Sequence, residues 1–162
     1  MVGKKKKDPS LKEKLIKWRK EHTVEKIDEP TNPKRAKSLG YKAKKGVIIA
    51  RGKIKKGGRR RRKYGRGGRK PKKAGLVKFT PGKGTKWIAE ERVAKKFPNM
   101  EVLNSYYVGE DGKHKWYEVI LVDPKNPAIK KDKNLNWVCK PCHKRRVLRG
   151  LTSAGKKSRG LK

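Results

Sequence analysis

The chain has 162 residues with 51 Lys and Arg against 14 Asp and Glu, a formal net charge of +37, and only 32% of its residues are hydrophobic. So low an apolar content allows one modest core and excludes a membrane span, which needs about 20 predominantly apolar residues. The N-terminus lacks the apolar stretch of a secretion signal, and two cysteines are too few for a disulfide framework, so we expect a cytoplasmic protein.

Acidic residues are absent from two long stretches of the chain. Residues 30–89 contain 23 Lys and Arg and no acid, and residues 133–162 contain 10 Lys and Arg and again no acid. An unbroken positive field repels itself, so charge that served solubility alone would mix the two signs. We therefore expect both stretches to lie against a polyanion.

Three elements are expected before the most basic region. Residues 10–22 predict a short helix with Ser10 as its N-cap. Asn32–Pro33 favours the start of a second helix of one or two turns, which ends at Gly40. The β-branched residues of 46–54 predict a strand.

The segment Lys53 to Lys73 is the most basic part of the chain. It holds 13 Lys and Arg in 21 residues, interrupted by five glycines. Like charges at this density oppose both helix and sheet, so we expect an arm that only a partner orders.

The apolar residues that follow the arm predict most of the core. A helix is expected over 86–97, capped by Thr85. The segments 102–108 and 115–122 predict two strands, and the turn 109–113 joins them as a hairpin. Beyond Trp137 the chain becomes basic and rich in Gly and Ser, and we expect a flexible tail.

These elements divide the chain into three parts. Residues 1–30 form an N-terminal helix and lead-in. Residues 31–132 form a small core that the basic arm at about 53–75 interrupts, and residues 133–162 form the basic tail. No internal repeat is present.

The basic arm has the chemistry of a nucleic-acid binder. Guanidinium groups pair bidentately with phosphate, and glycine lets the backbone come close to the nucleic acid. Tyr41 and Tyr64 lie among basic residues and could stack on bases. The alternative is a solvated linker or a transport signal, which the length of the run and the missing acids disfavour.

Cys139 and Cys142 have the spacing of half a zinc site, and with the following His143 they match the pattern of haem attachment. Haem attachment would need export, and no second pair of zinc ligands is evident. We therefore favour two ordinary side chains, with metal binding as the alternative.

Two further patterns suggest catalysis only superficially. Gly150 to Lys156 fits GxxxxGK, but Lys157 stands where magnesium would need Ser or Thr, so we expect a flexible phosphate-binding loop. Glu90 and Glu91 point about 100° apart on a helix, so they cannot face each other as acid and base, and we expect them to be solvated. An enzyme is therefore not expected.

Four blocks of the sequence carry a resemblance to a known family: RAKSLGYKAKKG at 35–46, KGGRR at 56–60, AEERVAKKFPNMEVLNSYYVGEDGKHKWYEVILVDP at 89–124 and KPCHKRRVLRGLTSAGKKSRGL at 140–161. Together they resemble the archaeal and eukaryotic L-fifteen-e family of large-subunit ribosomal proteins. The resemblance covers about residues 31–161. It is looser over the first 30 residues, and it predicts a further basic extension beyond Lys162.

This resemblance implies an α+β fold, in which a small antiparallel sheet with packed helices carries long basic extensions that bind RNA. It implies no cofactor and no catalytic role. It also implies RNA contacts by Arg35, Tyr41, Lys42 and Lys44, by the basic arm, and by the segment from His143 to Arg159.

Charge and resemblance together give a set of candidate RNA-binding residues, nearly all of them basic. They are Lys34, Arg35, Lys37, Tyr41, Lys42, Lys44, Lys45, Arg51, Lys53, Lys55, Lys56, Arg59, Arg60, Arg61, Arg62, Lys63, Tyr64, Arg66, Arg69, Lys70, Lys72, Lys73, Lys140, His143, Lys144, Arg145, Arg146, Arg149, Lys156, Lys157 and Arg159.

The function expected from the sequence is that of a structural constituent of the large ribosomal subunit. Its partners are the large-subunit ribosomal RNA and neighbouring ribosomal proteins, with no membrane and no small-molecule substrate. A DNA-packaging or chromatin protein would explain the charge equally well. An RNA-processing enzyme is a third hypothesis, and it would need a convergent acidic site built on residues such as Glu118 or Asp123.

Overall fold

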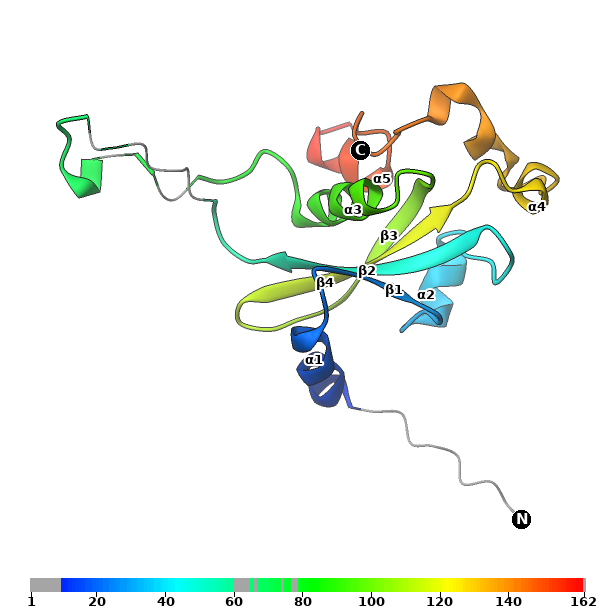
Figure 1. Cartoon of the computed structure of the whole chain (residues 1–162), viewed down its shortest axis with the longest axis horizontal. Coiled ribbons are helices and arrows are strands. Elements are labelled where there is room, and N and C mark those ends of the chain that lie inside the picture. Colours follow the sequence, from blue (N-terminus) through cyan, green and yellow to red (C-terminus); the bar gives the residue numbers. More distant parts are fainter. Residues whose placement is uncertain (1–9, 60–64, 66, 74, 77–78, 162) are drawn as a thin grey trace, which may run out of the picture.

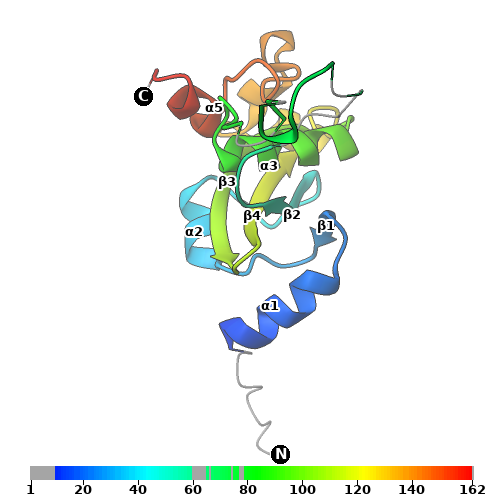
Figure 2. The ribbon, with the colours of Figure 1, turned by 90° about the vertical axis from the view of Figure 1, so that its left-hand side faces the viewer.

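A four-stranded antiparallel sheet forms the centre of the molecule, with the strand order β1-β2-β4-β3. The computed structural model describes residues 10–59, 65, 67–73, 75–76 and 79–161. The strands are β1 (Val24–Ile27), β2 (Val47–Lys55), β3 (Glu101–Glu110) and β4 (His114–Val122). Helices cover both faces of the sheet (Figures 1 and 2). The α+β fold class predicted from the sequence is confirmed.

The central strand β4 is buried on both sides. All seven residues from 116 to 122 are buried, which explains why this strand shows an apolar run rather than strict alternation. Ile120 and Val122 pack into the core on one face of the sheet, and Val119 and Leu121 pack into the core on the other face.

One face of the sheet is covered by α1 (Leu11–Lys20), α2 (Pro33–Ser38), α4 (Pro127–Lys130) and the 3₁₀ turn η2 (Asn136–Cys139). Ala36 of α2, Ile129 of α4 and Val138 of η2 join the core there. Ser10 caps α1 as predicted, and it shares a capping box with Glu13. Asn32 caps α2, which confirms the second predicted helix.

The other face of the sheet is covered by α3 (Thr85–Lys96), with α5 (Ser153–Ser158) beside it (Figure 2). Ala89 and Val93 of α3 are fully buried, and Trp87 is nearly so. The predicted cap of this helix is wrong: the N-cap is Gly84, and Thr85 instead shares a 2.7 Å hydrogen bond with the Tyr117 hydroxyl.

The predicted hairpin is confirmed, with strands longer than expected that leave a turn at 111–113. The strand β1 has no counterpart in the sequence-based prediction. It is only four residues long and carries Glu25 and Lys26, so it lacks an apolar run. It pairs antiparallel with β2, in a register that places Val24 opposite Gly52.

The basic arm leaves the sheet at the end of β2, as the extended loop in Figure 1 shows. Lys53, Ile54 and Lys55 belong to the strand itself, so the arm begins later than predicted. Among its described residues, Pro71–Lys73 form the 3₁₀ turn η1. No helix of the described residues is long and apolar enough to cross a membrane.

The C-terminal segment is not the flexible tail that its composition suggests. Val138, Val147 and Ala154 are buried, and residues 136–158 form η2, the 3₁₀ turn η3 (Pro141–His143) and α5. The indole of Trp87 donates a 2.9 Å hydrogen bond to the Val147 carbonyl, which ties the segment to α3. Its few apolar residues suffice because α3 and the sheet already provide a surface for them.

The GxxxxGK stretch is likewise a packed turn rather than a flexible loop. Gly150 has a φ of 69°, which favours glycine, and Thr152 caps α5 through the Gly155 amide at 3.2 Å. A Cβ at Gly155 would lie 2.7 Å from the backbone of Gly150, so these two glycines permit a close backbone contact.

Candidate nucleic-acid interface

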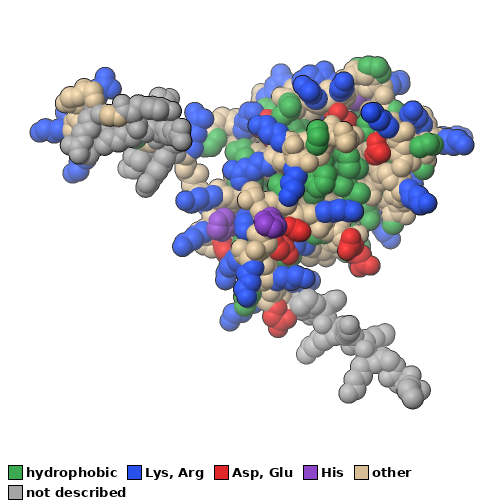
Figure 3. All heavy atoms as spheres, viewed as in Figure 1, with side chains coloured by type: hydrophobic (Ala, Val, Ile, Leu, Met, Phe, Trp, Pro, Cys, Tyr) green, Lys and Arg blue, Asp and Glu red, His purple; other side chains and the backbone are tan. Residues whose placement is uncertain are grey.

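Most of the candidate RNA-binding residues that the structure describes have exposed side chains. Figure 3 shows Lys and Arg over much of one face of the molecule and along the arm. The exposed members are Lys34, Arg35, Lys37, Lys45, Lys55, Arg59, Arg69, Lys70, Lys72, Lys73, Lys140, Lys144, Arg145, Arg149, Lys157 and Arg159. Arg60, Arg61, Arg62, Lys63, Tyr64 and Arg66 lie outside the described residues.

The two acid-free stretches come together around Lys86 at the start of α3. The pKa of Lys86 is lowered, first because its amine is half-buried and then because Arg35 and Lys157 lie near it, while Glu90 opposes the shift. Arg35 comes from α2, and Lys157 comes from α5. Three cations that lie far apart in sequence are thus close enough to act on one another electrostatically, and we call them the Lys86 cluster (Arg35, Lys86 and Lys157).

The Lys86 cluster contains a residue that the sequence did not single out. Lys86 opens a helix with an acidic residue at 90, so its sequence pattern is that of an ordinary amphipathic surface. Lys83, in the loop before α3, and Arg92, within α3, have exposed side chains and were not singled out either. The absence of acids from 30 to 89 was the one available signal, and it includes both Lys83 and Lys86.

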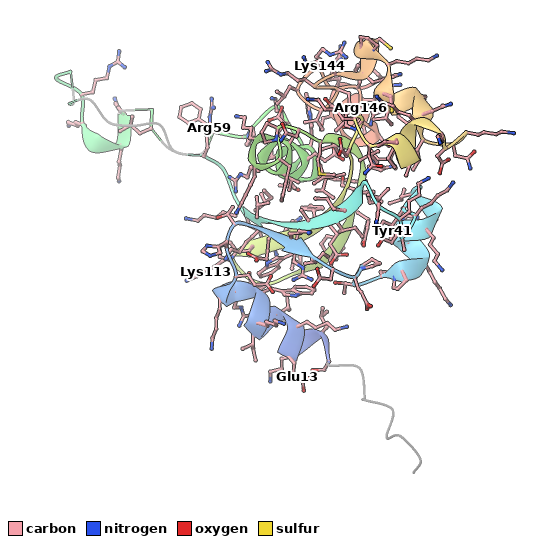
Figure 4. The ribbon with its side chains drawn as sticks, turned by 45° about the vertical axis from the view of Figure 1, so that its right-hand side comes forward. Glu13, Tyr41, Arg59, Lys113, Lys144 and Arg146 are labelled. Carbon is pink, nitrogen blue, oxygen red and sulfur yellow. The ribbon has the colours of Figure 1, made fainter. Side chains whose placement is uncertain are left out.

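Tyr41 is half-buried and packs against the core beneath α2 (Figure 4). The two lysines that follow it are held by an acid: Lys42 and Lys44 reach Asp132 at 3.1 and 2.5 Å. These hydrogen bonds and that of the Asn134 amide hold the pKa of Asp132 well below its usual range. Lys42 and Lys44 are therefore partly neutralised within the protein.

Two candidate arginines are used inside the protein, contrary to expectation. The buried Arg51 guanidinium donates to Glu21 at 2.9 Å and stacks over Trp18, 4.3 Å from the ring centroid. Arg146 donates to the backbone carbonyls of Val102 at 2.7 Å and Leu103 at 2.9 Å. Arg51 lies within β2, and Arg146 lies in a basic stretch after η3, so neither local sequence indicates that the side chain is buried.

Some other candidates are half-buried and bonded to the protein. Lys53 donates to the carbonyls of Arg19 and Glu21, and Lys56 reaches Glu110 at 2.9 Å. Lys156 is also half-buried. The amines of Lys53 and Lys56 are thus partly engaged within the protein.

The C-terminal segment presents several cations on one packed unit, and Figure 4 shows Lys144 at its outer surface. Arg149 donates to the carbonyls of Lys144, at 3.0 Å, and Cys142, which fixes its guanidinium group beside the turn. His143 packs edge-on against Trp137, with 4.8 Å between ring centroids. Burial and the neighbouring Arg146, Arg149 and Lys140 lower the pKa of His143.

Cys139 and Cys142 are free thiols, one half-buried and one exposed. Within the part of the chain that the structure describes, no three His, Cys, Asp or Glu side chains gather as a metal site would require. The geometry therefore adds no support to the zinc alternative.

The buried carboxylates are structural. Glu90 is fully buried, contrary to the expectation that it is solvated, and it accepts hydrogen bonds from Ser105 and Thr152. Burial raises the pKa of Glu90, while these hydrogen bonds and the nearby Lys86 and Arg146 oppose the rise.

Glu118 is also fully buried, and it accepts hydrogen bonds from the Thr31 amide at 3.0 Å and from the Tyr106 hydroxyl. Burial and the contact with Glu118 raise the pKa of Tyr106. A carboxylate engaged in this way is not placed for general acid or base catalysis on a large substrate.

The chain is similar to known ribosomal proteins. A family model described as Ribosomal L15 matches residues 3–162, which include both acid-free stretches and the whole sheet. The large ribosomal subunit protein eL15 of Methanocella arvoryzae (strain DSM 22066 / NBRC 105507 / MRE50) is 60% identical over 148 residues. The matched part covers 91% of this chain and 75% of that protein.

Proposed function

Because this chain belongs to the Ribosomal L15 family, whose members are structural proteins rather than enzymes, we propose that its exposed cations bind and stabilise ribosomal RNA at specific surfaces. It is a structural constituent of the large ribosomal subunit. The surfaces we propose are α2 with Lys45, the basic arm, and the C-terminal segment. The candidate residues that the structure leaves exposed carry these contacts, whereas Arg51 and Arg146 hold the protein together.

The observation that carries this proposal is the Lys86 cluster. A half-buried amine beside two further cations is electrostatically unfavourable unless an anion neutralises it, and Glu90 alone only partly does so. RNA phosphates that cross between α2 and α5 would supply that anion. A-form RNA offers phosphates and 2′-hydroxyls rather than a readable major groove, which suits recognition by a shaped basic surface.

We propose a division of labour along the chain. The core of 31–132 sets the geometry, the arm at about 53–75 and the segment 133–162 supply most of the charge, and the described part of the N-terminal region, residues 10–30, docks on the sheet. Packing of the C-terminal segment on α3 supports a preformed RNA-binding surface at that end of the molecule.

The test compares two charge-matched triple variants in binding large-subunit ribosomal RNA at several salt concentrations. Each phosphate contact adds about one to the slope of log affinity against log salt. Changing Arg35, Lys86 and Lys157 to Gln should lower that slope by about three. The control changes Lys12, Lys17 and Lys26, three exposed cations of α1 and β1, and should change the slope by less than about one. Equal slopes for the two variants would refute the proposed surface.

The DNA-packaging alternative predicts a different preference. A DNA-compacting protein should bind duplex DNA at least as well as structured RNA at the same salt concentration. Membership of a ribosomal protein family favours RNA, and we propose that the protein works in the cytoplasmic ribosome beside other ribosomal proteins. Competition between the two nucleic acids for the purified chain distinguishes the hypotheses.

A further inference from the structure

A cleft of about 730 Å³ lies at the base of the basic arm, between the end of β2 and the start of α3. Its walls come from residues 54–59 on one side and from residues 80–92 on the other. Figure 4 shows Arg59 on the ribbon where the arm leaves the body of the protein. The volume is within the ~300–1,000 Å³ that is typical of sites for small organic groups.

Backbone contacts fix the two walls of this cleft. The Arg59 amide donates a 2.9 Å hydrogen bond to the Phe79 carbonyl, and a Cβ at Gly58 would lie only 2.7 Å from that same oxygen. Glycine at 58 therefore allows the outgoing segment of the arm, at 58–59, to contact the returning segment at Phe79. The Lys56 amide donates a 2.8 Å hydrogen bond to the Lys113 carbonyl, which ties the start of the arm to the hairpin of β3 and β4.

The cleft combines an apolar interior with a cationic rim. Ile54, Ile88 and Pro81 supply the apolar wall, and Ile54 and Ile88 continue into the small core cluster around Tyr117. Lys55, Lys56, Arg59, Lys83 and Arg92 supply the cations, and among the described residues no Asp or Glu lines the cleft. Glu110 and Glu91 lie outside it, paired with Lys56 and Lys83.

This combination fits one kind of ligand better than a regular RNA helix. The phosphates of a regular helix would pair with the cations of the rim. They would leave the apolar wall without a contact, because paired bases are stacked inside the helix. An unstacked nucleotide brings a flat, largely apolar base together with its own phosphates, and guanidinium planes such as those of Arg59 and Arg92 can stack on bases.

We propose that the cleft at the base of the arm binds one unpaired nucleotide extruded from ribosomal RNA, with the base against Ile88 and the phosphates at the rim. This inference rests on the proposed function and names the part of the RNA that the arm's base recognises. Such a contact fixes the position of the protein on the RNA, which nonspecific electrostatic attraction does not do.

The experiment uses the full chain and two RNA hairpins that differ only by a single unpaired adenosine in the stem. Stacking of one base typically contributes a free energy that corresponds to about a tenfold gain in affinity. We expect the unchanged protein to bind the bulged hairpin about tenfold more tightly than the regular one, at about 0.15 M salt.

A pair of matched variants locates the effect. Gly82 lines the cleft, its φ is not left-handed, and an added Cβ would meet open space, so Gly82→Trp should fold normally and fill the cleft. Gly112, in the hairpin turn outside the cleft, has the same freedom, and Gly112→Trp is the control. Neither change alters the charge. Gly82→Trp should remove the preference for the bulge but keep the affinity for the regular hairpin, whereas Gly112→Trp should keep both.

Each outcome is decisive. Equal binding of the two hairpins by the unchanged chain would overturn the nucleotide site, as would a preference that survives in Gly82→Trp. Competition by a short acidic peptide that abolishes only the preference would assign the cleft to a protein partner instead, and would also overturn it. Failure to bind either hairpin would contradict the proposed RNA-binding function rather than the cleft alone.

Discussion

Thr152 donates a 2.5 Å hydrogen bond to the carboxylate of Glu90, and this contact joins the C-terminal segment to α3. Ser105 of β3 donates to the other carboxylate oxygen, so one buried acid connects three parts of the chain. Two hydroxyl donors do not fully replace water around a carboxylate, which is why burial still raises the pKa of Glu90. The basic C-terminal segment is thereby held as part of the fold.

Replacing Thr152 with Val should lower the free energy of unfolding by about 2–3 kcal/mol. The change leaves one oxygen of Glu90 without its donor and also removes the cap of α5. Urea denaturation measures the loss. Thr152→Ser, which keeps the hydroxyl, is the control and should cost less than about 1 kcal/mol. Equal losses for the two variants would show that the hydroxyl is unimportant.

Glu90 should make stability fall as pH rises. Because its pKa is higher in the folded chain than in the unfolded chain, the folded state binds more protons above the unfolded pKa of about 4.3. The unfolding free energy of the native chain, relative to that of Glu90→Gln, should therefore be larger at pH 5 than at pH 7.5. Each unit of pKa difference corresponds to about 1.4 kcal/mol. A difference between the two proteins that does not change with pH would contradict the raised pKa.

The sequence predicted α1, α2, α3 and the hairpin of β3 and β4 because their signals are local. Ser10 and Asn32 mark helix starts, and the Asp111–Gly112 turn joins the two strands, and each of these signals depends on a few neighbouring residues. The packing of residues 133–162 was missed because it depends on Trp87 and Glu90, which are about 60 residues away in sequence. Composition described the segment's charge correctly, but charge does not determine whether a segment packs.

The same limit applies to the candidate site. The missing acids identified most of the exposed cations, since no local carboxylate neutralises them. They could not distinguish Arg146 from its neighbour Arg145, because burial depends on the β3 carbonyls that Arg146 meets. They also gave no sign of the cleft, whose two walls are more than 20 residues apart.

Arg145 and Arg146 should therefore respond differently to the same substitution. Arg146→Met leaves the Val102 and Leu103 carbonyls without a donor and should cost about 2–4 kcal/mol of unfolding free energy. Arg145→Met changes an exposed side chain and should lower the unfolding free energy by less than about 0.5 kcal/mol. It should, however, lower the slope of log RNA affinity against log salt by about one. Denaturation and salt titration of both variants check this, and a stable Arg146→Met protein with weakened RNA binding would reverse the assignment.

Treatment with a metal chelator should leave the thermal stability of the protein unchanged. Cys139 and Cys142 are free, and no third ligand gathers with them in the described part of the chain. The thermal unfolding midpoint should be the same with and without a strong chelator, as it should for Cys142→Ser. One zinc per chain in the purified protein, together with a lower midpoint after chelation, would establish the metal site instead.

Limited trypsin digestion should separate the arm from the C-terminal segment. Arg69 and Lys72 are exposed in the arm, whereas Val147 and Thr152 anchor the chain around Arg146 in the core. Cleavage follows local opening, so the free protein should be cut first after residues 69 and 72 and only later within 143–159. Bound ribosomal RNA should slow the arm cuts, and Thr152→Val should speed the C-terminal ones. Simultaneous cleavage of both regions in the unchanged chain would mean that the hydrogen bond between Thr152 and Glu90 does not hold the segment in solution.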